Sequence, residues 1–115
     1  MLIRASILIV ASQLVIAIAD DVPNFNIARE CRVDSNSAFD PNAGLNATIK
    51  RCIDDEQKAK DDLQAQWSGF KNADRVMCMR LAVGDKSDDD ATPPSYVDLL
   101  TCLQDQQFAR KLPKE

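Results

Sequence analysis

Hydrophobic residues recur every three or four positions along most of this chain, which is the spacing of one face of an α-helix. The longest such run begins at Leu45 and ends at Phe70. Its stripe consists of Leu45, Ile49, Cys52, Glu56, Ala59, Leu63, Trp67 and Phe70. The pattern predicts one long amphipathic helix over residues 45–70.

A shorter helix is predicted before this long one, over residues 24–32. Phe25, Ala28 and Cys31 are helically spaced there, and Asn24 belongs to the residue types that cap helix N-termini. Residues 33–44 are rich in Asp, Asn, Ser, Pro and Gly, a composition typical of a connecting loop.

Two more helices are predicted after the long one, over residues 73–83 and 95–110. Asn72 is placed to cap the first of them. Ser95 followed by Asp98 resembles a capping box at the start of the second. Between them lies a polar, proline-ended acidic loop over residues 84–94. No segment has the alternation of a strand, so the sequence predicts an all-α bundle of about four helices.

The N-terminus resembles a secretory signal peptide over residues 1–19. Arg4 precedes a segment in which 12 of the 15 residues from Ala5 to Ala19 are apolar, and this segment ends in Ala-Ile-Ala before Asp20. The run is shorter than the roughly 20 residues that span a bilayer, which disfavours the alternative of an uncleaved anchor. The sequence therefore predicts an exported, single helical domain over residues 20–115 with no membrane span after cleavage.

The four cysteines are predicted to form two disulfides, because an even number in a short exported chain normally pairs. If the long helix folds back near Asn72, Cys52 is displaced from Cys78 by roughly 18 Å of helix rise. A disulfide spans only about 7 Å between Cα atoms. Cys78 and Cys102 lie at similar heights in an antiparallel pair, so we predict the bridges Cys31–Cys52 and Cys78–Cys102.

Composition excludes several classes of function. The net charge of −4 argues against a nucleic-acid surface, which needs clustered Lys and Arg. The chain has no histidine, the commonest general base and the usual zinc ligand. It also has no Cys-x-x-Cys pair of the kind found in redox and zinc sites. We therefore expect no enzymatic activity, no cofactor and no metal site.

Two acidic features are candidate sites. The run at residues 85–90 fails the calcium-loop pattern, because Asp90 stands where that loop needs Gly and Tyr96 where it needs Glu. A solvated loop is the favoured interpretation. Glu56 lies inside the apolar stripe, where a carboxylate is costly unless paired. We expect it to reach solvent or an arginine such as Arg75 or Arg80, with a functional buried acid as the alternative.

Three aromatic residues, Trp67, Phe70 and Tyr96, admit two interpretations. Aromatic side chains dominate small cores, so the first is a hydrophobic plug between helices. The second is an exposed aromatic anchor for a partner protein.

Four segments of the chain, residues 52–59, 67–70, 74–78 and 94–103, resemble a group of short exported proteins of rhizobia-like alphaproteobacteria. The resemblance covers about residues 31–105 and includes the Ser-Tyr-Val-Asp-Leu-Leu-Thr-Cys sequence that begins at Ser95. It implies a periplasmic bacterial protein and brings no catalytic residues with it.

A fainter similarity links the stretch from Cys52 through Leu63 to Trp67 with the helical module of lysozyme-inhibitor-like envelope proteins. Gln64 and Trp67 stand here where that pattern has Asn and, nearby, Tyr. An acidic surface suits a cationic partner such as lysozyme through complementary charge.

Together these patterns predict a non-enzymatic periplasmic or secreted binding module that contacts another protein. A lysozyme-inhibitor-like protein is one alternative. A small hydrophobic-ligand carrier, similar to four-cysteine odorant-binding proteins, is another. Those carriers have a closely spaced late cysteine pair, whereas Cys78 and Cys102 are 24 residues apart, and an enclosed pocket needs roughly 300 Å³ or more. The sequence leaves the partner, the biological process and the oligomeric state open.

Overall fold

The computed structural model describes residues 21–37, 42, 44–84 and 93–113. Within these residues the fold consists of helices without any strand, as the hydrophobic spacing predicted. The helices are α1 (Ile27–Ser37), α2 (Leu45–Gln66), the 3₁₀ turn η1 (Trp67–Gly69), α3 (Asn72–Val83) and α4 (Tyr96–Lys111). The predicted signal peptide and the acidic run at residues 85–90 lie outside the described residues.

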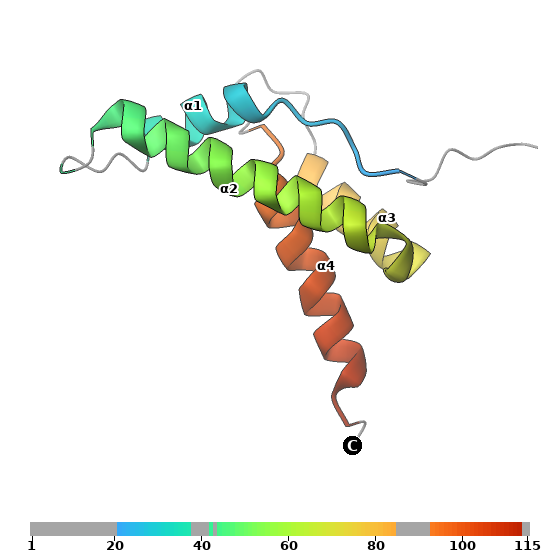
Figure 1. The fold of residues 1–115 in the computed structure, drawn as a ribbon. Helices are drawn as coiled ribbons and strands as arrows, with labels where there is room; N and C mark the ends of the chain where they lie inside the picture. Colours follow the sequence, from blue (N-terminus) through green and yellow to red (C-terminus); the bar gives the residue numbers. More distant parts are fainter. Residues whose placement is uncertain (1–20, 38–41, 43, 85–92, 114–115) are drawn as a thin grey trace, which may run out of the picture.

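The long helix α2 organises the others (Figure 1). α1 runs antiparallel along its first half, and α4 crosses it at a steep angle. α3 packs on α4, to which it is also joined covalently. In the described part of the chain, no helix is both long and apolar enough to cross a membrane.

The first helix differs from its predicted bounds of 24–32 at both ends. Asn26, not Asn24, receives the backbone N–H of Arg29 on its side-chain oxygen, at 3.1 Å, so the helix starts at Ile27. It continues to Ser37, through residues that composition assigned to a loop. The predicted start of the helix was wrong, because contacts with a distant part of the chain hold Pro23 and Phe25 outside the helix.

Those contacts come from the Tyr96 hydroxyl. It donates to the carbonyl oxygen of Pro23 and accepts the backbone N–H of Phe25, both at 2.8 Å. The rings of Phe25 and Tyr96 lie 4.7 Å apart between centroids. The N-terminal segment is thereby fastened to the first turn of α4.

The other helix boundaries lie close to their predictions. α2 begins after Gly44, whose φ of 82° is a conformation that favours glycine. Its last predicted turn is the 3₁₀ turn η1. Asn72 is the first residue of α3, not its N-cap, which is Lys71. Ser95 caps α4 as predicted, with its Oγ accepting the Asp98 N–H at 3.3 Å.

Both predicted disulfides are present. Cys31–Cys52 joins α1 to α2 with Cα atoms 5.5 Å apart. Cys78–Cys102 joins α3 to α4 with Cα atoms 5.7 Å apart. No described residue is a free cysteine. The covalent pairing therefore follows the helix geometry argued from the sequence.

An ion pair fixes the direction of α3 against α4. Asp74, at the start of α3, accepts two hydrogen bonds from Arg110, near the end of α4, at 2.9 and 2.6 Å. Since Cys78 meets Cys102 further along, the two helices are antiparallel. The hydrogen bonds from Arg110 hold the pKa of the Asp74 carboxyl below its ordinary value.

This ion pair makes stability depend on pH in the acidic range. A carboxyl with a lowered pKa contributes stability that is present above its ordinary pKa of 3.8 and is lost as the pH falls. We expect Asp74→Asn to lower the urea midpoint at neutral pH. The difference between the midpoints of wild type and variant should shrink as the pH falls below the ordinary carboxyl pKa of 3.8. A difference between the two urea midpoints that stays constant across the whole pH range would contradict the role of the Asp74–Arg110 ion pair.

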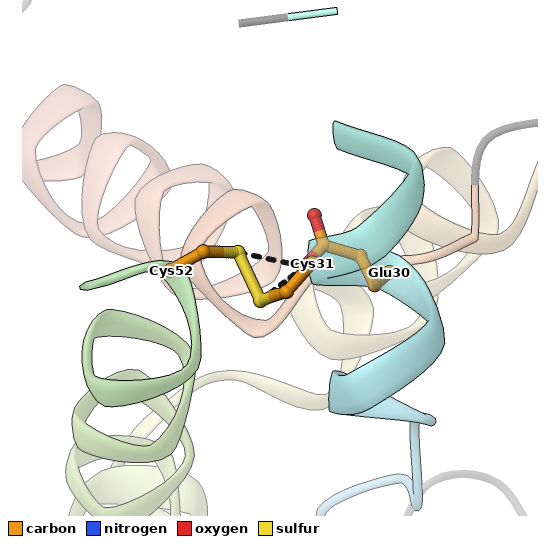
Figure 2. A group of neighbouring side chains, drawn as sticks. All are labelled: Glu30, Cys31 and Cys52. Atoms are coloured by element: carbon orange, nitrogen blue, oxygen red, sulfur yellow. Dashed lines mark hydrogen bonds between the residues drawn. A yellow bond between two sulfur atoms is a disulfide. The ribbon is translucent and has the colours of Figure 1, made fainter. Parts of the chain in front are cut away.

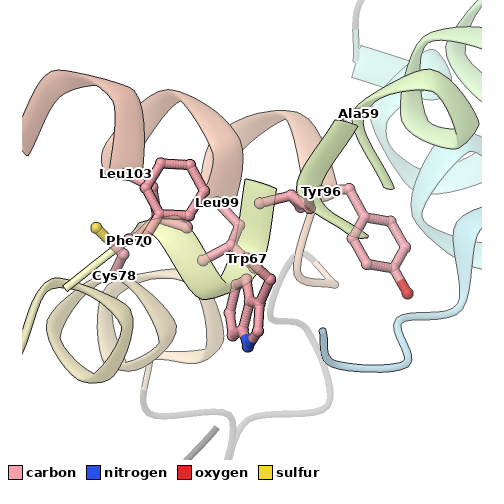
Figure 3. Close-up of a cluster of buried hydrophobic side chains, with 8 residues drawn as sticks. Ala59, Trp67, Phe70, Cys78, Tyr96, Leu99 and Leu103 are labelled. Carbon is pink, nitrogen blue, oxygen red and sulfur yellow. The ribbon is translucent and has the colours of Figure 1, made fainter. Parts of the chain in front are cut away.

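The hydrophobic core lies where α2, α3 and α4 meet (Figure 3). Its buried members are Ala59, Leu63, Trp67, Phe70, Cys78, Tyr96, Leu99 and Leu103. Trp67, Phe70 and Tyr96 are only 5%, 2% and 0% exposed. This burial favours the plug interpretation and removes the exposed aromatic anchor that the sequence had left open.

Candidate functional site

An open pocket lies where α1, α2 and the start of α4 come together, with a volume of about 290 Å³. Most of its charged lining is acidic, and the lining carboxyl groups belong to Glu30, Asp34, Asp55, Glu56 and Asp98. Among the described residues that line it, Arg51 alone carries a positive charge. The pocket therefore brings five carboxyl groups together from distant parts of the sequence.

Glu56 lines this pocket from α2 and contacts the start of α4. Only 3% of its surface is exposed. Its Oε1 accepts the Ser95 hydroxyl at 2.5 Å, and its Oε2 accepts the backbone N–H of Tyr96 at 2.7 Å. The first N–H groups of a helix lack partners within the helix and carry partial positive charge. Glu56, a residue of α2, thus caps the N-terminus of α4 by accepting these hydrogen bonds.

The sequence-based expectation for Glu56 was wrong. Neither solvent nor Arg75 or Arg80 satisfies this carboxylate, because the N-terminus of α4 supplies its hydrogen-bond donors. The Arg75 guanidinium instead lies over the Trp67 ring, 5.7 Å from its centroid. The carboxylate is paired, but with the Ser95 hydroxyl and the Tyr96 backbone N–H, which periodicity cannot locate.

Glu30 lies beside the first disulfide, as Figure 2 shows. Its side chain is 5% exposed, and its Oε2 lies 3.3 Å from Sγ of Cys31 and 3.5 Å from Sγ of Cys52. Sulfur atoms bonded to each other carry no hydrogen, so neither can donate to the carboxyl. In the part of the chain that the structure describes, no N–H or O–H group donates to Glu30.

The charged form of the Glu30 carboxyl is therefore disfavoured. Burial raises the pKa of Glu30 from its ordinary 4.5 to about 7, helped by the negative charges of Glu56, Asp34 and Asp98. Burial disfavours the charged form, and like charges disfavour it further. Near neutral pH this carboxyl is therefore only partly ionised, and a nearby positive charge would favour its ionised form.

Glu30 should make the protein less stable as the pH rises. A carboxyl whose pKa is higher in the folded state binds its proton more tightly there, so stability falls between pH 4.5 and about 7. We expect Glu30→Gln to raise the free energy of unfolding at pH 8 by about 1 to 2 kcal/mol, because the amide removes the charge but is still buried.

The measurement is urea unfolding of the oxidised protein at pH 8 and at pH 4. At pH 4 the carboxyl is mainly neutral in both folded and unfolded chains, so the variant should have little advantage there. An equal gain at both pH values would show that the effect is packing, and not charge.

A second buried polar group in the pocket also lacks a partner. Ser35 is 1% exposed, lines the same pocket, and its Oγ has no hydrogen-bond partner among the described residues. A buried hydroxyl without a partner costs free energy. The pocket thus contains two buried groups, Glu30 and Ser35, whose hydrogen-bonding capacity the protein itself leaves unused.

These groups do not form a metal centre. Among the described residues, one group of three possible ligands lies close enough to hold an ion, and it consists of Glu30, Cys31 and Cys52. Both sulfurs are already bonded to each other, so they are not available as thiolate ligands. The pocket's carboxyl groups are too dispersed to converge on one small ion.

Sequence reasoning singled out Glu56, Ser95 and Cys52 but missed Glu30 and Ser35. One signal was available. Glu30 directly precedes Cys31, and Glu56 follows Cys52 by one helical turn, so the predicted Cys31–Cys52 bridge brings two acids together.

No family model, curated protein or solved structure matches this chain. The resemblances to exported alphaproteobacterial proteins and to lysozyme-inhibitor-like proteins therefore stay predictions. The acidic pocket and the two disulfides are the features on which a function can be proposed.

Proposed function

We propose that this protein is an exported, non-enzymatic binding module that presents its acidic pocket to a partner protein. The two disulfides support export, because such bonds form and persist in oxidising compartments. With the predicted leader removed, the mature chain would begin at Asp20 and work in the periplasm or outside the cell.

The observation that carries this proposal is how firmly the pocket is built. The Cys31–Cys52 bridge holds α1 against α2 on one side of it. On the other side, the hydrogen bonds of Glu56 to Ser95 and Tyr96 hold the start of α4. A binding surface that is rigid before it meets its partner loses less entropy on association.

The hydrogen bonds of the Ser95 hydroxyl, which contacts the Glu56 carboxylate, favour binding over catalysis. Ser95 donates to Glu56, but the same carboxylate also accepts the Tyr96 N–H, and Ser95 accepts the Asp98 N–H. These are the contacts of a helix cap. A serine nucleophile needs a base that is free to take its proton and an oriented third group.

A carrier of hydrophobic ligands is less well supported. Aromatic and aliphatic side chains fill the core between the helices. The acidic pocket is open, and so is a second one, of about 450 Å³, lined by Asp21, Val22, Gln64, Trp67 and Ser68. Neither is the enclosed, mainly apolar cavity typical of such carriers.

The test is capture of a partner by the oxidised mature chain. The protein would be immobilised and exposed to an envelope extract of the cells that make it, and a retained protein would then be purified and its binding measured by calorimetry. We expect saturable one-to-one binding that is lost when the chain is reduced and alkylated. Retention of the same proteins by the reduced chain would contradict the proposal.

A lysozyme-inhibitor-like role is the alternative that the acidic pocket favours, because an acidic surface complements a cationic partner such as lysozyme. Adding the oxidised protein at equimolar concentration to lysozyme should then abolish lysis of cell-wall substrate. Unchanged lysis at a tenfold excess would exclude this alternative and leave the general binding role in place.

A further inference from the structure

The two buried carboxyl groups of the acidic pocket, Glu56 and Glu30, differ in whether they have hydrogen-bond donors. Glu56 is compensated by the N-terminus of α4. Glu30 is buried beside the disulfide with no donor among the described residues, and the buried Ser35 hydroxyl has no partner there either. Unpaired buried groups of this kind are uncommon in folded proteins and call for an explanation.

Two properties define what would satisfy them. The occupant must be positively charged, because the surrounding side chains include the acids Asp34, Asp55 and Asp98. It must also offer several N–H donors spread in space, because the carboxyl groups do not converge on one point as a metal ion requires.

We propose that the pocket binds the guanidinium group of an arginine side chain presented by the partner protein. A guanidinium carries five N–H donors in a planar fork and remains charged at all accessible pH values. Its acceptors would be the groups that line the pocket from α1 and α4, which include the carboxyls of Glu30 and Asp98 and the Ser35 hydroxyl. The assignment rests on the proposed binding function and names the partner's anchoring residue.

The size of the pocket agrees with one side chain. Its volume of about 290 Å³ is at the lower limit of pockets that hold drug-sized ligands, and it is open to solvent. Arginine is also among the residues that most often anchor protein interfaces. Arg51, which lines the pocket from α2, is itself exposed and leaves Glu30 without a donor.

Binding should depend on pH, with a direction set by Glu30. Burial and the charges of Glu56, Asp34 and Asp98 raise the pKa of this carboxyl to about 7, and a bound guanidinium would lower it. Asp55 and Arg51 on α2 are the other charged groups among the described residues that line the pocket. Because the cation prefers the ionised carboxyl, affinity should rise about tenfold between pH 5 and pH 8.

The experiment titrates N-acetyl-arginine-N-methylamide into the oxidised protein at low salt and follows backbone amide signals by NMR. The matched control ligand is the citrulline analogue, which has nearly the same shape but no charge. We expect the arginine amide to shift signals around Glu30, Ser35 and Asp98 in a saturable way, and the citrulline amide to shift none of them.

Two variants with the same loss of charge on α4 separate a site from general attraction. Asp98→Asn removes a carboxyl that lines the pocket, whereas Asp105→Asn removes an exposed one outside its lining. We expect the first to weaken binding about tenfold and the second to have little effect. Glu30→Gln should weaken binding at pH 8 and abolish its dependence on pH.

The proposal is overturned if the citrulline amide binds as well as the arginine amide, or if both α4 variants weaken binding equally. Tighter binding of the corresponding lysine amide, or of calcium, at the same signals would also overturn the assignment to a guanidinium.

Failure of the binding function is a separate result. If the arginine amide binds but no partner is captured from the extract, the site stands and the proposed function fails. If a partner is captured equally by wild type and Asp98→Asn, the binding function stands and the arginine site fails.

Discussion

Replacing Glu56 by alanine is expected to lower the free energy of unfolding of the oxidised protein by about 3 kcal/mol. The substitution leaves the Ser95 hydroxyl and the Tyr96 N–H buried without their acceptor. It also removes the negative charge at the N-terminus of α4. Urea unfolding followed by circular dichroism at pH 5, where the neighbouring Glu30 is largely protonated, measures this loss.

Asp55→Ala is the matched control, because Asp55 is the exposed neighbour of Glu56 on α2. It should change the free energy of unfolding by no more than about 0.5 kcal/mol. Glu56→Gln should fall between the two, since the amide keeps one acceptor oxygen. Equal small effects of all three substitutions would mean that Glu56 does not cap α4.

Removing the first disulfide, with Cys31→Ala and Cys52→Ala together, is expected to cost about 3 kcal/mol. The bridge closes a span of 21 residues and ties α1 to α2. Without it, the amide protons of α1 should exchange with solvent much faster, because the described core cluster lies mainly on α2, α3 and α4. Hydrogen exchange with mass spectrometry reports this by segment.

The double replacement of Cys78 and Cys102 provides the comparison. The Cys78–Cys102 bridge closes a similar span of 24 residues, so its removal should lower the free energy of unfolding by a similar amount. Its effect on exchange, however, should fall on α3 and α4 and spare α1. Faster exchange over the whole chain in both variants would show that the helices unfold as one unit and that α1 is not separately stapled.

Helix type and disulfide pairing were predictable because both follow from local periodicity. The stripe from Leu45 to Phe70 specifies one face of α2, and the rise per residue then excludes a bridge between Cys52 and Cys78. Ser95 was recognisable as a cap because its own helix supplies the donor three residues later, at Asp98. The helices and the cap need only neighbours in sequence, and the disulfide pairing needs in addition only the fold-back near Asn72.

The remaining features depend on contacts between distant residues. α1 starts late because Tyr96 holds Pro23 and Phe25, more than 70 positions away in the chain. Glu56 was noticed as an anomaly, but its partners on α4 lie about 40 positions further on. No spacing rule reveals such pairs, since they arise from how α4 crosses α2.

The acidic pocket illustrates the same limit. Its carboxyl groups come from three helices, and no local pattern shows that Glu30 and Asp98 line one pocket. Once the disulfide joins Cys31 to Cys52, Glu30 is buried and its charge becomes consequential. The acidic pocket of this protein thus depends on the Cys31–Cys52 disulfide.

The most direct test of the central claim is the covalent state of the protein in the cells that make it. The sample would be alkylated at lysis and digested without reduction, and its peptides would be identified by mass spectrometry. The account predicts an N-terminus at Asp20, peptides joined as Cys31–Cys52 and Cys78–Cys102, and no alkylated cysteine. A full-length chain with its four cysteines alkylated would contradict it.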